Sequence, residues 1–407
     1  MRILLFSNWL PPIRSGSAYY ASSLAHSLAG RGHEVQVVTL DWGPEYLPSG
    51  DLPFQIHRLP VIKLSHLPLF YNLKLMGLAY TRHNCRALKA IVTQFRPDLL
   101  HHVNHIFDTV FLTNHVGRWA GIPVVGSITT PIQHQNPVKQ RLMEVADRLT
   151  VGGFGVSRWD GIVSLDYTVH RYVGHLYGKE AQQRSHVIPF GARLEASSLY
   201  EEHSQGRSER PQVLMAGHIH PFRNPVELVR AMTIVVKEIP NARLVLAGRV
   251  DLREPVRVAR ELGFTADQVS FLGETLHDEV VRLMKTSHLF ASWVTGPYPS
   301  LGTAPMEAML CETPVINDLP EDLFGEGKLK NGENILLVNS RDPQSIAETI
   351  IRLLKDESLR RRIGAGGRRF VLQHLSWDSI AADMERLYET ILRERGMNPS
   401  RKHSVSI

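Results

Sequence analysis

Short apolar runs alternate with longer amphipathic segments along the first half of the chain. Residues 3–6 and 35–39 are apolar runs typical of strands, and residues 21–29 between them have helical spacing. Further apolar runs continue the series at 99–102, 124–128, 161–165 and 187–189. Alternation of this kind predicts a parallel sheet that is covered by helices on both faces.

A polar stretch separates this series from a second one. Residues 196–211 (ASSLYEEHSQGRSERP) contain few apolar side chains and are the best candidate for a linker. Helical patterns follow at 226–236 and 278–286, and they lie between apolar runs at 212–216, 244–247, 269–271, 289–292, 314–316 and 335–338. The sequence therefore predicts a second α/β domain of similar size.

The last amphipathic segment, 378–393, has its apolar residues on one face of a helix. These residues are Ile380, Met384, Leu387, Ile391 and Leu392. We therefore expect two Rossmann-like, doubly wound domains and a closing helix. In such sheets ligands bind outside the carboxyl ends of the strands, and two of those edges can face one cleft.

The composition narrows the class of protein without assigning a function. At 407 residues the chain exceeds the size of a single core, and 43% hydrophobic and 21% charged residues are ordinary values for a globular protein. The two cysteines, Cys85 and Cys311, argue against a disulfide framework and favour a reducing compartment. The first residues resemble a strand more than a signal peptide, and no run of about 18 apolar residues occurs. We therefore expect a cytoplasmic protein.

The positive charge favours polyanionic partners. The formal net charge is +6 and the pI is about 9.3, which suits nucleic acid, an anionic membrane or a phosphate-bearing ligand. No basic motif interleaved with aromatic residues occurs, so we exclude nucleic acid. Segment 64–90 mixes apolar residues with Lys74, Arg82, Arg86 and Lys89, which predicts peripheral contact with an anionic membrane. The alternative is a core-packing helix pair with a solvated basic face.

The strongest chemical signal is the sequence PSLGTAPMEAMLCETPVI at 299–316. We expect a helix to begin near Pro305, because proline suits the first helical turn. The amides of Gly302, Thr303 and Ala304 then point out of the helix start. Amides and helix dipole together suit a phosphate group. The alternative is a tight loop without a ligand.

Other residues extend this candidate phosphate site. Glu307 lies one turn inside the helix and can accept hydrogen bonds from sugar or ribose hydroxyls, unless it is simply solvated. In residues 213–225 a strand is followed by Gly217, His218 and Arg223, and the arginine fork suits phosphate oxygens. Gly16, after the first strand, permits a ligand to approach the backbone closely.

Three histidines lie close together in the sequence, but their spacing does not match a known metal site. His101, His102 and His105 follow a strand, but no cysteine or carboxylate set completes a known metal pattern. The chain also contains no Asp-x-Asp sequence to hold a divalent ion on a diphosphate. We therefore expect no metal and no cofactor. We assign Asn104 and His105 to acceptor binding, with ordinary polar surface as the more frequent alternative.

Taken together, several motifs resemble the large family-four glycosyltransferases of GT-B fold. The similarity covers nearly the whole chain in the right order, through PPIRSGSA, LAHSLAGRGHEVQVVT, VIPFGA, MAGHIHPFRNP, LVLAGR, SLGTAPMEAMLCETPVI and LSWDSIAADMERLY. It implies retaining, metal-independent transfer from a nucleotide sugar. It also implies that helix 376–396 crosses back to an acceptor-binding domain at 1–200, with the nucleotide-sugar domain at 208–375.

The resemblance assigns the donor side of the site residue by residue. The family's phosphate-binding arginine and lysine fall on His218 and Arg223, and its two glutamates fall on Pro299 and Glu307. Glu307 matches the glutamate that holds the ribose, whereas Pro299 provides no carboxylate for the donor sugar. Gly16 matches the glycine beside the donor phosphates.

The reaction centre matches the family less closely. The family's histidine near the reacting carbon falls on Thr129, and His134 lies five residues later as a candidate substitute. The implied function is transfer of a sugar onto a saccharide, lipid-linked or small-molecule acceptor in glycan biosynthesis. Arg223 and the amides of Gly302, Thr303 and Ala304 would stabilise the leaving diphosphate. The alternatives are a catalytically weak binding or partner subunit, a phosphorylase, or a sugar-nucleotide epimerase.

Overall fold

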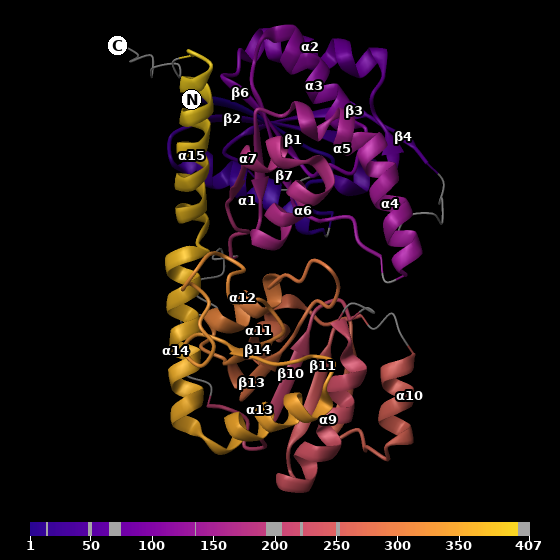
Figure 1. Cartoon of the computed structure of the whole chain (residues 1–407), viewed down its shortest axis with the longest axis vertical. Coiled ribbons are helices and arrows are strands. Elements are labelled where there is room, and N and C mark those ends of the chain that lie inside the picture. Colours follow the sequence, from indigo (N-terminus) through magenta and orange to yellow (C-terminus); the bar gives the residue numbers. More distant parts are fainter. Residues whose placement is uncertain are drawn as a thin grey trace. The chain divides into compact units, whose positions relative to one another are not determined.

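A computed structural model describes residues 1–13, 15–47, 51–64, 75–134, 136–192, 206–219, 223–249 and 253–397. The chain forms two units, which Figure 1 shows coloured along the sequence. Unit 1 comprises Met1–Gly191 with Trp377–Ile407, and unit 2 comprises Ala192–Ser376. The chain therefore leaves unit 1 after Gly191 and returns to it for its last helix.

Unit 1 is built on a parallel sheet of seven strands in the order β3-β2-β1-β6-β7-β8-β9. Leu5 in β1 lies opposite Val37 on one side and His101 on the other, so the strand order reverses at β1. The inner strands are buried along their length, as expected for a sheet that is covered on both faces. The strands are β1 (Arg2–Ser7), β2 (Glu34–Asp41), β3 (Gln55–Pro60), β6 (Leu99–Val103), β7 (Val124–Ile128), β8 (Gly161–Ser164) and β9 (Ser185–Val187), beside a small antiparallel pair, β4 (Ile62–Lys63) and β5 (Gly77–Leu78).

Polar side chains start the helices of unit 1 by capping their first free amides. Ser15 accepts a hydrogen bond from the amide of Ala18 at 3.1 Å, and Thr81 accepts one from the amide of Asn84 at 3.1 Å. The helices are α1 (Gly16–Gly30), α2 (Arg82–Phe95), α3 (Thr109–Ala120), α4 (Pro137–Leu149), α5 (Val151–Phe154), α6 (Tyr167–Tyr177), α7 (Lys179–Gln183) and α15 (Trp377–Glu394), with short 3-10 turns η1 (Pro44–Tyr46) and η2 (Val156–Arg158).

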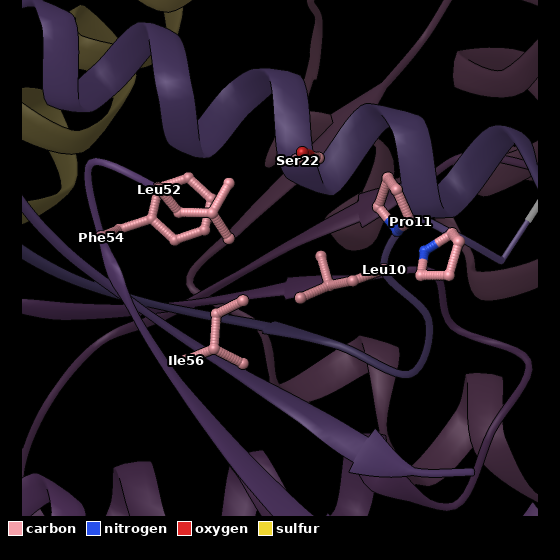
Figure 2. Close-up of a pocket in the computed structure, with 7 residues that line it drawn as sticks. Leu10, Pro11, Ser22, Leu52, Phe54 and Ile56 are labelled. Carbon is pink, nitrogen blue, oxygen red and sulfur yellow. The ribbon is translucent and has the colours of Figure 1, made fainter. Parts of the chain in front are cut away.

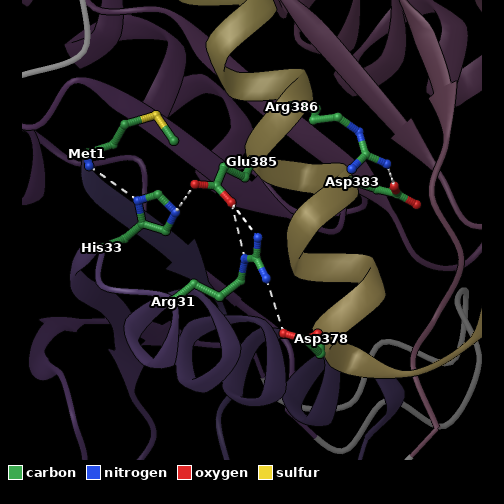
Figure 3. A network of polar contacts seen from close by, with 7 residues as sticks. All are labelled: Met1, Arg31, His33, Asp378, Asp383, Glu385 and Arg386. Atoms are coloured by element: carbon green, nitrogen blue, oxygen red, sulfur yellow. Dashed lines mark hydrogen bonds and ion pairs between the residues drawn. The ribbon is translucent and has the colours of Figure 1, made fainter. Parts of the chain in front are cut away.

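The closing helix α15 is part of the core of unit 1. Its apolar residues Ile380, Met384 and Tyr388 are fully buried in one cluster with α1 and the sheet. A polar network also holds it, as Figure 3 shows. The guanidinium of Arg31 donates to Glu385 at 2.8 Å and to Asp378 at 3.1 Å. The spacing of apolar residues predicted this helix, and the contacts show where it packs.

Unit 2 repeats the same architecture with a parallel sheet of six strands in the order β12-β11-β10-β13-β14-β15. The strands are β10 (Gln212–Ala216), β11 (Arg243–Ala247), β12 (Val269–Gly273), β13 (Leu289–Ala291), β14 (Val315–Asn317) and β15 (Leu336–Leu337). The helices are α9 (Pro225–Glu238), α10 (Glu254–Glu261), α11 (His277–Thr286), α12 (Thr303–Leu310), α13 (Pro343–Lys355) and α14 (Glu357–His374). Two parallel sheets with helices between their strands confirm the predicted α/β class with doubly wound sheets.

Two predicted segments fall partly outside the described residues. These are 65–74 in the predicted membrane segment 64–90, and 196–205 in the predicted linker 196–211. In the described remainder, the ammonium of Lys89 lies 4.8 Å from the ring centroid of Trp119. Membrane contact through 64–90 stays a prediction. Of the helices that the structure describes, none combines the length and hydrophobicity needed to span a bilayer.

Candidate functional site

The carboxyl edge of the unit 2 sheet contains the point at which the strand order reverses. β10 pairs with β11 on one side and β13 on the other, so the loops that follow β10 and β13 diverge at this edge. Open α/β sheets bind ligands at such a point. The loop after β10 leads to Arg223, and the loop after β13 leads through Ser292 to Gly302.

Arg223 is a half-buried cation without a carboxylate partner in the described part of the chain. Its Nη1 donates to Ser292 Oγ at 2.7 Å, and its Nε is buried without a hydrogen-bond partner among the described residues. Burial lowers the pKa of Arg223 to about 10, so the side chain stays charged at neutral pH. A charge of this kind is costly unless an anion balances it.

The start of α12 lies beside this guanidinium. A β-carbon placed on Gly302 would lie 3.7 Å from Arg223 Nη2. Gly302 caps the helix with φ 75° and ψ 170°, and no side chain caps the first amides. An anion at this point would therefore meet the amides of Gly302, Thr303 and Ala304 together with the arginine charge. The helix begins at Thr303, two residues before the predicted start, which keeps Pro305 in its first turn.

Glu307 lies on the next turn of α12 and is paired. Its Oε1 is 3.2 Å from Nε2 of His277, the first residue of α11. The glutamate side chain is 12% exposed, so it is largely buried beside His277. Sequence reasoning missed His277, because the pair joins two helices that are 30 residues apart in the chain.

The remaining donor-side predictions lie around the same strand ends. Gly217 has φ 114°, and a β-carbon on Gly248, directly after the neighbouring strand β11, would lie only 1.9 Å from the Gly217 carbonyl oxygen. Glycine is therefore required where these two strand ends meet. His218 is exposed, and Pro299 is half-buried in the loop before α12. Both positions stay predictions as donor contacts.

The carboxyl edge of unit 1 brings together three of the predicted residues. Ser17 Oγ lies 3.0 Å from Thr129 Oγ1 and accepts a hydrogen bond from Asn104 Nδ2 at 3.0 Å. Gly16 directly precedes Ser17 as the first residue of α1. Asn104 has φ 71°, a conformation that asparagine tolerates better than most residues and that occurs at binding sites. Ser17 was not predicted, since its partners are distant in sequence.

The other two unit 1 predictions lie apart from this cluster. His105 is fully buried, and its Nε2 lies 3.3 Å from the hydroxyl of Tyr172. Its predicted acceptor contact has no support from this position. The loop that contains His134 is tied to α4: the His134 amide donates to Gln140 Oε1 at 2.5 Å, and Gln140 Nε2 donates to the Ile132 carbonyl at 3.1 Å.

The alternative that the histidine cluster is polar surface is wrong. His101 and His102 point into the core of unit 1, and neither is exposed. Burial lowers the pKa of each to about 3, so both rings are neutral. His101 bonds the hydroxyls of Tyr388 and Ser127, and His102 bonds Thr109. Among the described residues, no group of three histidine, cysteine or acidic side chains is placed to hold a metal ion.

A small apolar pocket lies beside α1 in unit 1 (Figure 2). It has a volume of about 190 Å³ and contains a single hydroxyl, from Ser22. The other lining residues are Leu10, Pro11, Pro12, Leu52, Phe54 and Ile56. The pocket carries no charged or titratable group, so nothing in it supports a reaction.

Comparisons with known proteins cover nearly the whole chain. The model described as Glycosyltransferase Family 4 matches residues 14–196, and the model described as Glycosyl transferases group 1 matches residues 200–370. The MMP alpha-(1->4)-mannosyltransferase of Mycolicibacterium hassiacum is 25% identical over 424 residues, covering 96% of this chain and 98% of that protein.

Solved structures with the same fold also match. Sucrose-phosphate synthase from Thermosynechococcus elongatus has a TM-score of 0.71 and 21% identity, covering 97% of this chain and 100% of that one. Anabaena HepE in complex with UDP-glucose has a TM-score of 0.68 and 15% identity, covering 96% and 100%. At these identities the structural matches show a shared fold.

Proposed function

Because this chain belongs to the family-four glycosyltransferases of GT-B fold, we propose that it transfers a sugar from a nucleotide-sugar donor to an acceptor hydroxyl, with retention of configuration and without a metal ion. Membership of the family supports glycosyltransferase activity. The donor class is proposed from the site, and the stereochemistry and the independence from a metal ion are proposed from the resemblance to the family.

The observation that carries the proposal is the unbalanced positive charge at the start of α12. Arg223 lies beside the start of α12, where no side chain caps the amides of Gly302, Thr303 and Ala304. A diphosphate fits this arrangement, since its oxygens accept from amides and guanidinium at once. HepE, which shares the fold, was solved with UDP-glucose, and this also favours a nucleotide sugar.

In the proposed reaction, side chains and amides stabilise the negative charge of the leaving diphosphate in place of a metal ion. The bond between the anomeric carbon and the diphosphate oxygen breaks, and its electron pair stays on the leaving oxygen. The acceptor oxygen forms the new bond from the same face, and its proton passes to that leaving phosphate oxygen. Arg223 and the α12 amides stabilise the growing negative charge. Glu307, oriented by His277, accepts a hydrogen bond from a ribose hydroxyl.

In unit 1 the cluster of Ser17, Asn104 and Thr129 is proposed to contact the substrates. Hydroxyl and amide groups of this kind bind sugar hydroxyls, and Gly16 leaves room for the donor phosphates beside the start of α1. We retain Thr129 and His134 as candidates for the reaction centre. The acceptor is a saccharide, a lipid-linked saccharide or a small molecule.

Arg223→Ala tests the donor side. We expect kcat/KM for the preferred donor to fall by about 100-fold or more, because a charge that stabilises the transition state is lost. Arg230→Ala is the matched control, since Arg230 is an exposed arginine on α9 that forms an ion pair with Glu227. Nucleotide release with saturating acceptor is the measurement. Unchanged turnover in Arg223→Ala would remove this residue from the role.

Two readouts of the same assay test the finer claims. NMR of the product should show the anomeric configuration of the donor, and turnover should persist in EDTA. An inverted product or a loss of activity on chelation would contradict the proposal.

Pro299, which provides no carboxylate for the donor sugar, favours one second candidate function. This is a protein of the same fold that binds the donor without turning it over, and calorimetric binding without nucleotide release would identify it.

A further inference from the structure

Helix α4 of unit 1 presents its apolar side chains outward. Val138, Leu142, Val145 and Leu149 are 68%, 65%, 48% and 64% exposed. Their spacing of four, three and four residues places them in one stripe along the helix. Surface helices of globular proteins normally bury such a stripe, and an exposed one marks an interaction surface.

The inward face of α4 is polar and well satisfied. Gln140 donates to the Ile132 carbonyl and to Glu144, and the buried carboxylate of Asp147 accepts from the hydroxyl of Tyr177. The orientation of the helix is therefore fixed by specific hydrogen bonds. Rotating the helix to hide the stripe would break these hydrogen bonds.

The exposed charged side chains of α4 are all positive. Lys139, Arg141 and Arg148 on α4 are exposed, whereas the two carboxylates of the helix, Glu144 and Asp147, are turned inward. At 100° per residue, Lys139 lies on one side of the stripe and the two arginines lie on the other. Beyond α4, Phe154 at the end of α5 adds an aromatic side chain that is 57% exposed.

We propose that α4 docks this protein onto an anionic lipid surface. The aliphatic stripe enters the boundary between headgroups and acyl chains, and the flanking cations contact lipid phosphates. Aliphatic residues bordered by lysine and arginine are the composition that interfacial helices use. A protein partner would need a matching acidic rim, and a second copy of α4 would place like charges against one another. Charge complementarity therefore favours lipid.

Docking at α4 has a consequence for the acceptor that rests on the proposed function. The loop with Ile132 and His134, which follows Thr129 in the chain, is hydrogen-bonded to Gln140 of α4. A helix lying in the lipid interface holds this loop next to the headgroups. The acceptor hydroxyl is then carried by a lipid or a lipid-linked saccharide.

Flotation of the full-length protein with lipid vesicles tests the proposal. Wild type should float with vesicles of phosphatidylcholine and phosphatidylglycerol, and it should stay behind with phosphatidylcholine alone. The variant Leu142→Ser with Leu149→Ser should bind at least about tenfold more weakly, because two interfacial side chains are lost. Its matched control is Leu262→Ser with Leu272→Ser, two unit 2 positions that are 43% and 48% exposed.

Several outcomes would overturn the proposal. They are failure of wild type to float, equal binding to neutral vesicles, and unchanged binding of the α4 variant. Sedimentation velocity without lipid adds another: a wild-type dimer that Leu142→Ser with Leu149→Ser dissociates would show that a second copy occupies the stripe. Thermal unfolding confirms that the variant is folded. Vesicle binding does not depend on turnover, so it is distinguishable from failure of the proposed reaction, which Arg223→Ala tests.

Discussion

Gly302 shows how much the proposed donor site depends on one backbone conformation. Its φ of 75° and ψ of 170° lie in a region that is essentially restricted to glycine. Gly302→Ala should lower the free energy of unfolding by about 1–3 kcal/mol through this strain. Because the strain sits where the amides meet Arg223, nucleotide affinity should fall as well. Thermal unfolding and titration calorimetry with nucleoside diphosphates measure the two effects.

Gly178 provides a control for strain without a ligand site. It has φ 92° and ψ 173°, and a β-carbon there would meet nothing within 4 Å. Gly178→Ala should cost similar stability in unit 1 and leave nucleotide affinity unchanged. Equal affinity in Gly302→Ala and wild type would mean that no anion binds at the start of α12.

At the scale of single residues, sequence reasoning found the groups with a local signal. Gly302 and Arg223 follow strands in recognisable motifs. Their partners have no such signal: Ser292 is 69 residues from Arg223, and Ser17 is 112 residues from Thr129. Hydrogen bonds across such separations depend on strand order, which a single chain does not display. The buried position of His101 was missed for the same reason, because its partner Tyr388 lies 287 residues away.

At the scale of elements, α15 depends on a small network of charges (Figure 3). Burial alone would raise the pKa of Glu385, but the Arg31 hydrogen bond and the charges of His33 and Arg31 hold it below its ordinary value. Glu385→Gln should therefore lower the free energy of unfolding at neutral pH by about 1 kcal/mol. The stabilisation is present above the ordinary pKa of glutamate and is lost as the pH falls through the lowered one.

The same helix offers a matched control. Asp383→Asn removes a carboxylate that pairs with Arg386 within α15, as Figure 3 shows, so this change should have a smaller effect. Chemical unfolding at neutral and acidic pH compares the two variants. An equal loss in both would mean that Glu385 contributes nothing beyond an ordinary surface pair.

Strands were easier to predict than the helices to which we assign functions. Buried parallel strands are continuous apolar runs, so 244–247 and 124–128 coincide closely with β11 and β7. Helix α4 was not predicted as a separate feature, because sequence periodicity finds an apolar stripe without telling which way it faces. The exposed fractions of its side chains, together with the hydrogen bonds of Gln140 and Asp147 on the other face, show that this stripe points outward.

At the scale of the whole molecule, two buried histidines set a pH dependence. His101 and His102 have pKa values of about 3 when folded, against 6.5 ordinarily. Below about pH 6.5 these histidines are protonated in the unfolded chain but stay neutral in the native chain. The free energy of unfolding therefore falls by about 1.4 kcal/mol per pH unit for each histidine as the pH is lowered. His102→Gln should make this dependence shallower by one proton. Urea unfolding between pH 7 and pH 4.5 measures the slope, and an unchanged slope would contradict the assignment.

The division of the chain has a consequence for how this protein is made. α15 completes the core of unit 1, yet it is synthesised after every residue of unit 2. During synthesis, the apolar surface of residues 1–191 that α15 covers in the finished protein therefore stays exposed until unit 2 has been made. A truncation that removes α15 should therefore destabilise unit 1, although unit 1 begins at the other end of the chain. Unit 2 should still fold, because it contains no part of the deleted segment.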